Sequence, residues 1–274
     1  MTYKNNNVLE FYKELPFNIS GDLNLAIKQI KMNNPLDIYP FLKGLIPENK
    51  KIRIIDIGCG GGWLVNSLAY HLGDNIDVIG IDFNPNVIDY AKKVKLSLNV
   101  KSKFFVSDLF TFEVENKFDI IISLGVLHHT NHCIKAINHI MKYAKNNSHV
   151  FIGLYHKYGR RPFLDYFKNL VNMDENQLYN EYKKLHDIND EKKSFSWFRD
   201  QVLHPHETQH SFEEIIPIFE QNGFTIIRTS LNRFKKIKDY QDIIDKESDW
   251  YYYAKRKLAN LEYFPGFFIV IGRR

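Results

Sequence analysis

The chain has 274 residues, and at ~150 residues per domain this length predicts two domains, or one domain with insertions. Hydrophobic residues make up 44% and charged residues 25% of the chain, which is typical of a packed globular protein and excludes collagen, a disordered chain and a disulfide scaffold. The formal net charge of +5 is not concentrated in one basic module. This distribution disfavours DNA as a partner and leaves a small RNA substrate open.

The sequence also bears on location. No stretch approaches the ~18 consecutive apolar residues of a membrane span, and the first residues, MTYKNNNVLEF, lack the apolar core of a signal peptide. The two cysteines, Cys59 and Cys133, form neither a disulfide framework nor a CxxC zinc motif. We therefore predict a cytoplasmic protein without a membrane partner.

Strand and helix patterns alternate from residue 51 to residue 156. The β-branched run at 51–57 ends in a glycine cluster and predicts a buried strand, and the spacing of leucines over 63–72 predicts the helix after it. The pattern continues with strands at 77–83, 101–110, 118–127 and 148–156 and with helices at 84–95 and 133–144. Such alternation predicts a parallel sheet with helices on both faces.

The alternation stops after residue 156 and resumes with a helix at 211–224 and strands at 223–231 and 266–274. We predict a doubly wound, Rossmann-like α/β fold with a seven-stranded sheet and a helical, aromatic insertion after the fifth strand. The predicted parts are an N-terminal helical cap (1–48), a core (49–156 and 211–274), the insertion (157–210) and a helical insertion between the last two strands (234–263). The two insertions cap the cleft or bury a homodimer surface, and the sequence leaves both open.

The first predicted strand leads into a glycine-rich loop. Ligands of open α/β sheets bind beyond the carboxyl ends of the strands, and Asp56 to Gly62 at this end read DIGCGGG. Glycines allow the backbone to turn sharply and to approach a ligand closely. Asp82 ends the second strand 20 residues after Gly62, the distance at which an acid meets ribose hydroxyls. A nucleoside ligand is implied.

Two common nucleotide motifs are excluded at this loop. The dinucleotide fingerprint G-x-G-x-x-G needs glycine at position 63, where the chain has Trp63. A Walker A loop needs a lysine after the glycines, and none follows. NAD, FAD and ATP-type phosphate binding are therefore disfavoured.

The loop resembles the first motif of the class I S-adenosylmethionine-dependent methyltransferases, D-x-G-x-G-x-G. The resemblance extends to Asp82 at the ribose position, to Ser107-Asp108-Leu109 at the adenine position and to SLGVLHH at Ser123 to His129. Four motifs in the family's order cover roughly residues 50–155. Asp82 and Asp108 also suit a helix cap and a turn, and both interpretations stay open here.

The resemblance implies S-adenosylmethionine as the cofactor and S-adenosylhomocysteine as its product. By position in the motifs, the implied cofactor-binding residues are Asp56, Gly58, Cys59, Gly60, Gly62, Asp82, Phe83, Asp108, Leu109, Leu124 and Gly125. The chain lacks the N-P-P-[YF] loop and the Pro-Cys pair of resembling DNA methyltransferases. Its overall arrangement is similar to a small-molecule branch of the family.

We therefore expect methyl transfer to an oxygen or nitrogen of a small metabolite that carries an anionic group or a sugar. The alternatives are a tRNA-modifying methyltransferase and a non-catalytic scaffold that binds the cofactor. A basic stripe across the insertion would favour RNA, and an enclosed pocket would favour a metabolite.

Histidines supply the candidate catalytic groups, because a near-neutral imidazole is the usual base for a hydroxyl or amine. The candidates are His129 after the fourth strand, His156 after the fifth, and His204 and His206 in the segment VLHPHETQH. Packing roles are equally open for His129. His204, His206 and His210 could also converge on a metal, but we predict a protein without a metal.

The segment YHKYGRRPF supplies the candidate substrate-binding residues. Tyr155, Tyr158, Arg160 and Arg161 follow the fifth strand directly, and His210 lies near the end of the insertion. Planar guanidinium groups bind carboxylates and phosphates in a bidentate manner, so these residues predict an anion clamp beside an aromatic wall. The alternative is a solvated basic turn.

Overall fold

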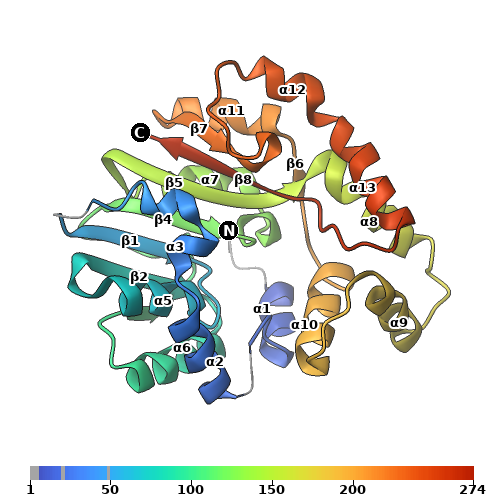
Figure 1. Ribbon diagram of the computed structural model, residues 1–274, viewed down its shortest axis with the longest axis horizontal. Coiled ribbons are helices and arrows are strands. Elements are labelled where there is room, and N and C mark those ends of the chain that lie inside the picture. The colour runs from blue at the N-terminus through green and yellow to red at the C-terminus, as the bar shows by residue number, and fades with distance from the viewer. Residues whose placement is uncertain (1–5, 20–21, 48–49) are drawn as a thin grey trace.

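The structure is a computed structural model that describes residues 6–19, 22–47 and 50–274. Its centre is a sheet in the order β3-β2-β1-β4-β5-β8-β7, with a short β6 paired to β5 (Figure 1). The strands are β1 (Ile52–Ile57), β2 (Ile76–Asp82), β3 (Lys103–Val106), β4 (Phe118–Leu124), β5 (Ala144–His156), β6 (Gln209–His210), β7 (Thr225–Thr229) and β8 (Phe267–Arg273). The predicted Rossmann-like α/β fold is confirmed, and β6 is the strand that the sequence did not predict.

The strands differ in direction. β1 runs parallel to β2 and β4, and β4 runs parallel to β5, as the alternation predicts. β8, however, is antiparallel to both β5 and β7. The chain leaves β7 at the carboxyl edge of the sheet and re-enters β8 at that same edge, where Phe267 pairs with Tyr155. β8 must therefore run back across the sheet.

Helices pack on both faces of the sheet. These are α5 (Trp63–Leu72), α6 (Pro85–Leu98), α7 (Cys133–Met141) and α11 (Phe212–Gln221). Val65 and Ile88 pack with Ile54 on one face, whereas Ile137 and Phe212 pack on the other. Burial of such apolar side chains stabilises the fold by about 1.5–3 kcal/mol each. Asn84 caps α6, because its side chain accepts from the Asn86 N–H at 3.0 Å.

The N-terminal segment and the segment after β5 are helical. The N-terminal helices are α1 (Asn6–Glu14), α2 (Leu23–Met32), α3 (Pro35–Ile38) and α4 (Pro40–Lys43), and the segment after β5 holds α8 (Lys157–Lys168), α9 (Glu175–Leu185) and α10 (Glu191–Val202). α1 lies beside α10 (Figure 1), and the Arg199 side chain donates to Glu14 at 2.8 Å. Distant parts of the sequence thus meet over the carboxyl edge of the sheet.

The aromatic residues of the inserted helices form a small core of their own. Phe163, Phe167, Tyr182 and Phe198 are buried together, with Tyr263 packed against them. Tyr263 follows α12 (Gln241–Glu247) and α13 (Asp249–Ala259). Many of the aromatic side chains in the inserted helices are therefore buried against other residues of this chain. The predicted domain boundaries and the predicted dimer stay predictions.

Among the described residues, no helix has both the length and the apolar character needed to cross a membrane. Cys59 and Cys133 are both free thiols. The predicted cytoplasmic location stays a prediction.

Candidate active site

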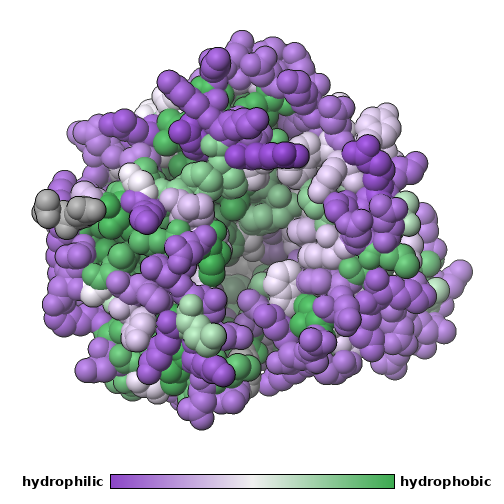
Figure 2. All heavy atoms as spheres, viewed as in Figure 1, coloured by the Kyte–Doolittle hydropathy of each residue, from purple (hydrophilic) through white to green (hydrophobic). Residues whose placement is uncertain are grey.

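A cavity of about 440 Å³ opens at the carboxyl edge of the sheet. Figure 2 shows a central hollow whose visible wall is largely hydrophobic. One side of the cavity is formed by Gly58, Gly60 and Asp82, and another side is formed by Tyr12 of α1 and Asp200 of α10. The predicted cofactor motifs thus face a wall supplied by the N-terminal helix and the inserted helices.

The glycine loop turns because its glycines adopt backbone angles that other residues avoid. Gly58, Gly60 and Gly62 all have positive φ, at 72°, 50° and 71°. A Cβ on Gly62 would lie 2.7 Å from both Phe104 and Ala91. The loop is therefore held tightly against side chains of β3 and α6, and a larger residue at position 62 would push it outward.

Asp82 ties this loop to the end of β2. Its carboxylate accepts from the Gly60 N–H at 3.0 Å and from the Asn84 N–H at 2.9 Å. Burial raises the pKa of Asp82 to about 6, although these backbone hydrogen bonds oppose the shift. Burial and the nearby Asp82 raise the pKa of Asp56 to about 7. Asp108 accepts from the Phe110 N–H at 2.9 Å, so it has the turn role as well as a place in the wall.

The structure places the predicted cofactor residues in two groups. Eight of them line the cavity: Gly58, Gly60, Asp82, Phe83, Asp108, Leu109, Leu124 and Gly125. Asp56, Cys59 and Gly62 are not among the lining residues. Burial raises the pKa of the Cys59 thiol well above its ordinary value, which argues against a nucleophilic role.

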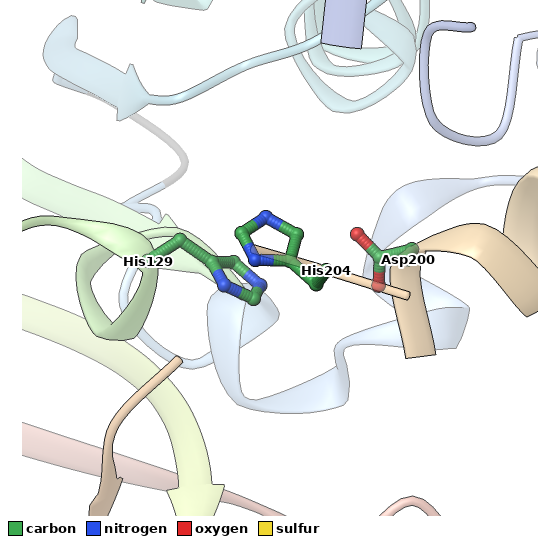
Figure 3. Close-up of side chains that lie close together, drawn as sticks. All are labelled: His129, Asp200 and His204. Carbon is green, nitrogen blue, oxygen red and sulfur yellow. The ribbon is translucent and has the colours of Figure 1, made fainter. Parts of the chain in front are cut away.

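Three polar side chains from separate parts of the chain meet near the other side of the cavity. Figure 3 shows His129, from the short helix η2 (Leu127–His129), with His204 and with Asp200. One ligand-type atom from each lies within 4.8 Å of the others. The His129 and His204 rings stack with their centroids 3.7 Å apart. The arrangement therefore joins two predicted catalytic candidates to an acid that the sequence analysis missed.

Asp200 is the centre of a hydrogen-bond network. Its Oδ1 accepts from the Tyr12 hydroxyl at 2.5 Å, and its Oδ2 accepts from the Gln201 side chain at 2.7 Å. Gln201 also donates to the Tyr155 hydroxyl at 2.7 Å. The Asn84 side chain donates to the Tyr12 carbonyl at 3.0 Å. The network thus reaches from the ribose-position loop to α10.

The hydrogen bonds assign the tautomers of His128 and His129. His129 Nδ1 lies 2.9 Å from the His206 carbonyl, which only accepts, so Nδ1 carries the proton. His128 Nδ1 accepts from the Tyr155 N–H, so its Nε2 carries a proton and donates to His129 Nε2 at 3.1 Å. Burial lowers the pKa of both imidazoles, so both are neutral near pH 7.

His204 is assigned in the same way. Its Nδ1 accepts from the His206 N–H at 3.1 Å, so Nε2 carries the proton. Burial lowers the pKa of His204 to about 2. Within the described part of the chain, its buried Nε2 has no hydrogen-bond partner.

These tautomers bear on metal binding. A metal ligand must offer a free lone pair, but those of His129 Nε2 and His204 Nδ1 are already used. The cluster of His129, Asp200 and His204 therefore fits a protein–ligand contact better than a coordinated ion. The predicted absence of a metal stays a prediction.

The other candidate histidines hold the surrounding structure together. His156 is fully buried, and its Nε2 donates to Glu247 at 2.8 Å while its Nδ1 accepts from the Gly159 N–H. His206 Nε2 donates to the Thr130 carbonyl at 3.0 Å. The cavity lining does not include His156, His206 or His210.

The predicted anion clamp separates into different environments. Arg160 is fully buried, forms two hydrogen bonds to Glu207 at 3.1 and 2.8 Å, and lies 4.0 Å from the Tyr155 ring centroid. Arg161 pairs with Asp165, and its side chain is 71% exposed. Tyr155 lines the cavity, whereas Tyr158 contacts the His156 ring and does not line it. The structure therefore does not bring the two arginines together on a ligand.

Several lining residues were not predicted. They include Val8, Tyr12 and Phe17 near α1, Trp197, Asp200 and Gln201 on α10, and Tyr263 before β8. Trp197, Asp200 and Gln201 have the i, i+3, i+4 spacing of one helix face. That spacing was the available signal, but it belongs to no motif.

Comparisons with known proteins identify the family of the chain. A family model described as a methyltransferase domain matches residues 48–256. Ubiquinone biosynthesis O-methyltransferase of Pelagibacter ubique (strain HTCC1062) is 32% identical over 151 residues, which cover 50% of this chain and 59% of that protein. The O-methyltransferase of the same name from Aliivibrio fischeri (strain ATCC 700601 / ES114) is 28% identical over 135 residues, 47% and 55% of the two chains. The chain spans about half the length of the curated relatives it matches.

Solved structures share the fold. Magnesium protoporphyrin IX methyltransferase from Synechocystis PCC 6803 with bound SAM has a TM-score of 0.55 at 16% identity. The alignment covers 100% of this chain and 100% of that chain. PKMT2 from Rickettsia typhi has a TM-score of 0.62 at 15% identity, covering 85% of this chain and 52% of that one. The family model extends over well over half of the chain and includes all four motifs. The chain therefore belongs to the class I S-adenosylmethionine-dependent methyltransferases.

Proposed function

We propose that this chain transfers a methyl group to a hydroxyl oxygen of a small, largely apolar compound that carries no negative charge near that oxygen. One observation carries the proposal. A single cavity is lined by the cofactor motifs and also by Tyr12, Tyr155 and Asp200. A methyl donor and a methyl acceptor could therefore lie in contact there, shielded by α1 and α10.

The residues of the cofactor side fit S-adenosylmethionine. Asp82 presents a buried carboxylate for the ribose hydroxyls, and Asp108 lies on the same wall for the adenine amine. The glycine loop offers backbone at Gly58 and Gly60 without a side chain in the way. When bound, the cofactor supplies an activated methyl group on a sulfonium.

The methyl-acceptor side favours an uncharged, aromatic or apolar compound. Phe17, Trp197, Tyr263 and Phe267 line it, and no lysine or arginine is among the described residues that line the cavity. The anionic acceptor expected from the sequence depended on Arg160 and Arg161. Arg160 is held by Glu207, and Arg161 pairs with Asp165 and does not line the cavity. The relatives named above are called O-methyltransferases, which supports oxygen as the accepting atom.

The test uses tritiated-methyl S-adenosylmethionine and a matched pair of phenols. We expect label to enter methyl 3,4-dihydroxybenzoate at least ~10-fold faster than 3,4-dihydroxybenzoate, because the cavity has no cation to pair with a carboxylate. Faster labelling of the acid would contradict the uncharged acceptor. Labelling of unfractionated tRNA in place of both phenols would favour the RNA alternative, and binding of S-adenosylhomocysteine without any transfer would favour a scaffold.

Cofactor binding should also depend on pH. Asp82 has a pKa of about 6, so below that pH its neutral carboxyl becomes a weaker hydrogen-bond acceptor for ribose. We expect the affinity for S-adenosylhomocysteine to fall as the pH drops from 7.5 to 5, measured by calorimetry, and to vary less in Asp82→Asn.

The effect of Asp82 protonation on the stability of the fold has the opposite sign to its effect on cofactor affinity. Because the pKa of Asp82 is raised in the folded state, the folded chain binds more protons than the unfolded chain between the two pKa values. The contribution of Asp82 to the free energy of unfolding therefore rises as the pH falls through 6. In the binding experiment, an affinity for S-adenosylhomocysteine at pH 5 equal to that at pH 7.5 would contradict the role of Asp82 in binding ribose.

A further inference from the structure

We infer that the Asp200 carboxylate, and not a histidine, takes the proton from the hydroxyl that receives the methyl group. The inference rests on the proposed function. It assigns a catalytic residue on α10, outside the four cofactor motifs of this chain. It also replaces the catalytic histidines expected from the sequence.

The nearby imidazoles of His129 and His204 have no free lone pair. His129 Nε2 accepts from His128, and its Nδ1 carries a proton. His204 Nδ1 accepts from the His206 N–H, which leaves a proton on Nε2. A general base must offer a lone pair to the proton it removes. Neither imidazole can do so without breaking an existing hydrogen bond.

The Asp200 carboxylate, in contrast, has lone pairs that are free to accept a proton. Asp200 lines the cavity and is only 5% exposed. Its two oxygens each accept one hydrogen bond, from Tyr12 and from Gln201, whereas an ionised carboxylate has about four acceptor positions. The two donors fix the orientation of the carboxylate and leave further lone pairs for a ligand.

The groups that surround Asp200 are uncharged near pH 7. The titratable groups around Asp200 are Tyr12, His129, Tyr155, Tyr182, His204 and Tyr263. Burial keeps each of them in its neutral form near pH 7. The nearest cation of the network, Arg160, binds Gln201 and is paired with Glu207. None of the ion pairs of the described residues includes Asp200, so no cation competes with a proton for its carboxylate oxygens.

In the proposed methyl transfer, one bond forms and one bond breaks. The hydroxyl oxygen of the methyl acceptor forms a bond to the methyl carbon while the bond between that carbon and sulfur breaks, and the electron pair stays on sulfur. The hydroxyl proton passes to an Asp200 oxygen. It leaves to water when the products depart, which restores the carboxylate. The buried Nε2–H of His204, which has no partner among the described residues, is a donor beside this carboxylate.

The main test is Asp200→Asn, which keeps the shape of the side chain and removes the base. With methyl 3,4-dihydroxybenzoate as the probe, we expect the rate of methyl transfer to fall by ~10²–10⁴-fold. Affinity for S-adenosylhomocysteine should stay within about twofold of the unaltered chain, because Asp200 belongs to none of the four cofactor motifs and the amide keeps acceptor and donor atoms for its neighbours. Asp190→Asn is the matched control, since Asp190 caps the same helix from an exposed position and asparagine also caps. It should transfer at the unaltered rate.

A second variant tests the base without removing it. Tyr12→Phe deletes a hydrogen bond that favours the ionised carboxylate, so the acid limb of the pH–rate profile should move to higher pH by about one unit. A structural role alone would lower the rate without moving this limb. Rates for Asp200→Asn within tenfold of the unaltered chain, or an unmoved limb in Tyr12→Phe, would overturn the inference. Failure of the unaltered chain to methylate the probe would instead count against the proposed function.

Discussion

Replacing Asp82 with alanine should weaken the binding of S-adenosylhomocysteine by about 10- to 150-fold, because a hydrogen bond to a charged acceptor contributes about 1.5–3 kcal/mol. Calorimetry at pH 7.5 measures this directly, at a pH where Asp82 is ionised. The change acts twice. It removes the acceptor for ribose, and it also releases the Gly60 N–H that the carboxylate holds at 3.0 Å.

A matched control separates the site from a general loss of charge. Asp74→Ala removes an acid whose side chain is 75% exposed and which pairs with Lys101 at the surface. Exposed pairs contribute little to stability, so cofactor affinity should not change. Equal affinity in Asp82→Ala and the unaltered chain would refute the ribose assignment. Thermal unfolding of both variants would show whether the loop change spreads into the fold.

The cofactor side of the fold could be predicted because its signals are local. A β-branched strand, a glycine loop and an acid at the end of the next strand each occur within a few residues, and the parallel sheet brings their ends to one edge. The direction of β8 could not be predicted in this way. An apolar run such as 266–274 has the same pattern in either direction, and its direction depends on where the preceding helices return the chain.

The methyl-acceptor side was less predictable, for a related reason. Tyr12 and Asp200 are 188 residues apart and meet only because α1 packs beside α10. Each is a single polar residue within a helix, and no motif in its sequence neighbourhood marks it as part of a site. The histidines attracted attention because their residue type suits catalysis. Their hydrogen bonds, which decide whether a lone pair is free, depend on tertiary contacts that the sequence does not show.

Arg160 illustrates the same difficulty with charge. Its position directly after a strand end suits an anion clamp, but the Glu207 that neutralises it lies 47 residues later. Burial of a guanidinium is costly unless its donors are satisfied. Here Nε and Nη2 bind Glu207, and Nη1 and Nη2 also bind Gln201. Arg160 therefore positions Gln201, which in turn holds Asp200 and Tyr155.

Arg160→Leu should consequently destabilise the fold rather than weaken one ligand contact. Removing one partner of a buried ion pair costs about 3–5 kcal/mol, because Glu207 is left as an uncompensated charge. At about 2–4 °C per kcal/mol for a chain of this size, the melting temperature should fall by roughly 6–20 °C, measured by calorimetry or circular dichroism. Arg161→Leu is the adjacent control, and its exposed side chain predicts a change of less than about 1 kcal/mol.

The double variant Arg160→Leu/Glu207→Leu distinguishes the buried charge from lost packing. If the unpaired Glu207 carboxylate causes the damage, removing it should restore part of the lost stability, since apolar replacements of both partners are often tolerated. No recovery in the double variant would mean that the hydrogen bonds to Gln201 and the stacking on Tyr155 matter more than the charge. A melting temperature unchanged in Arg160→Leu, with methyl transfer lost, would contradict this structural role and return Arg160 to the list of residues that bind the substrate.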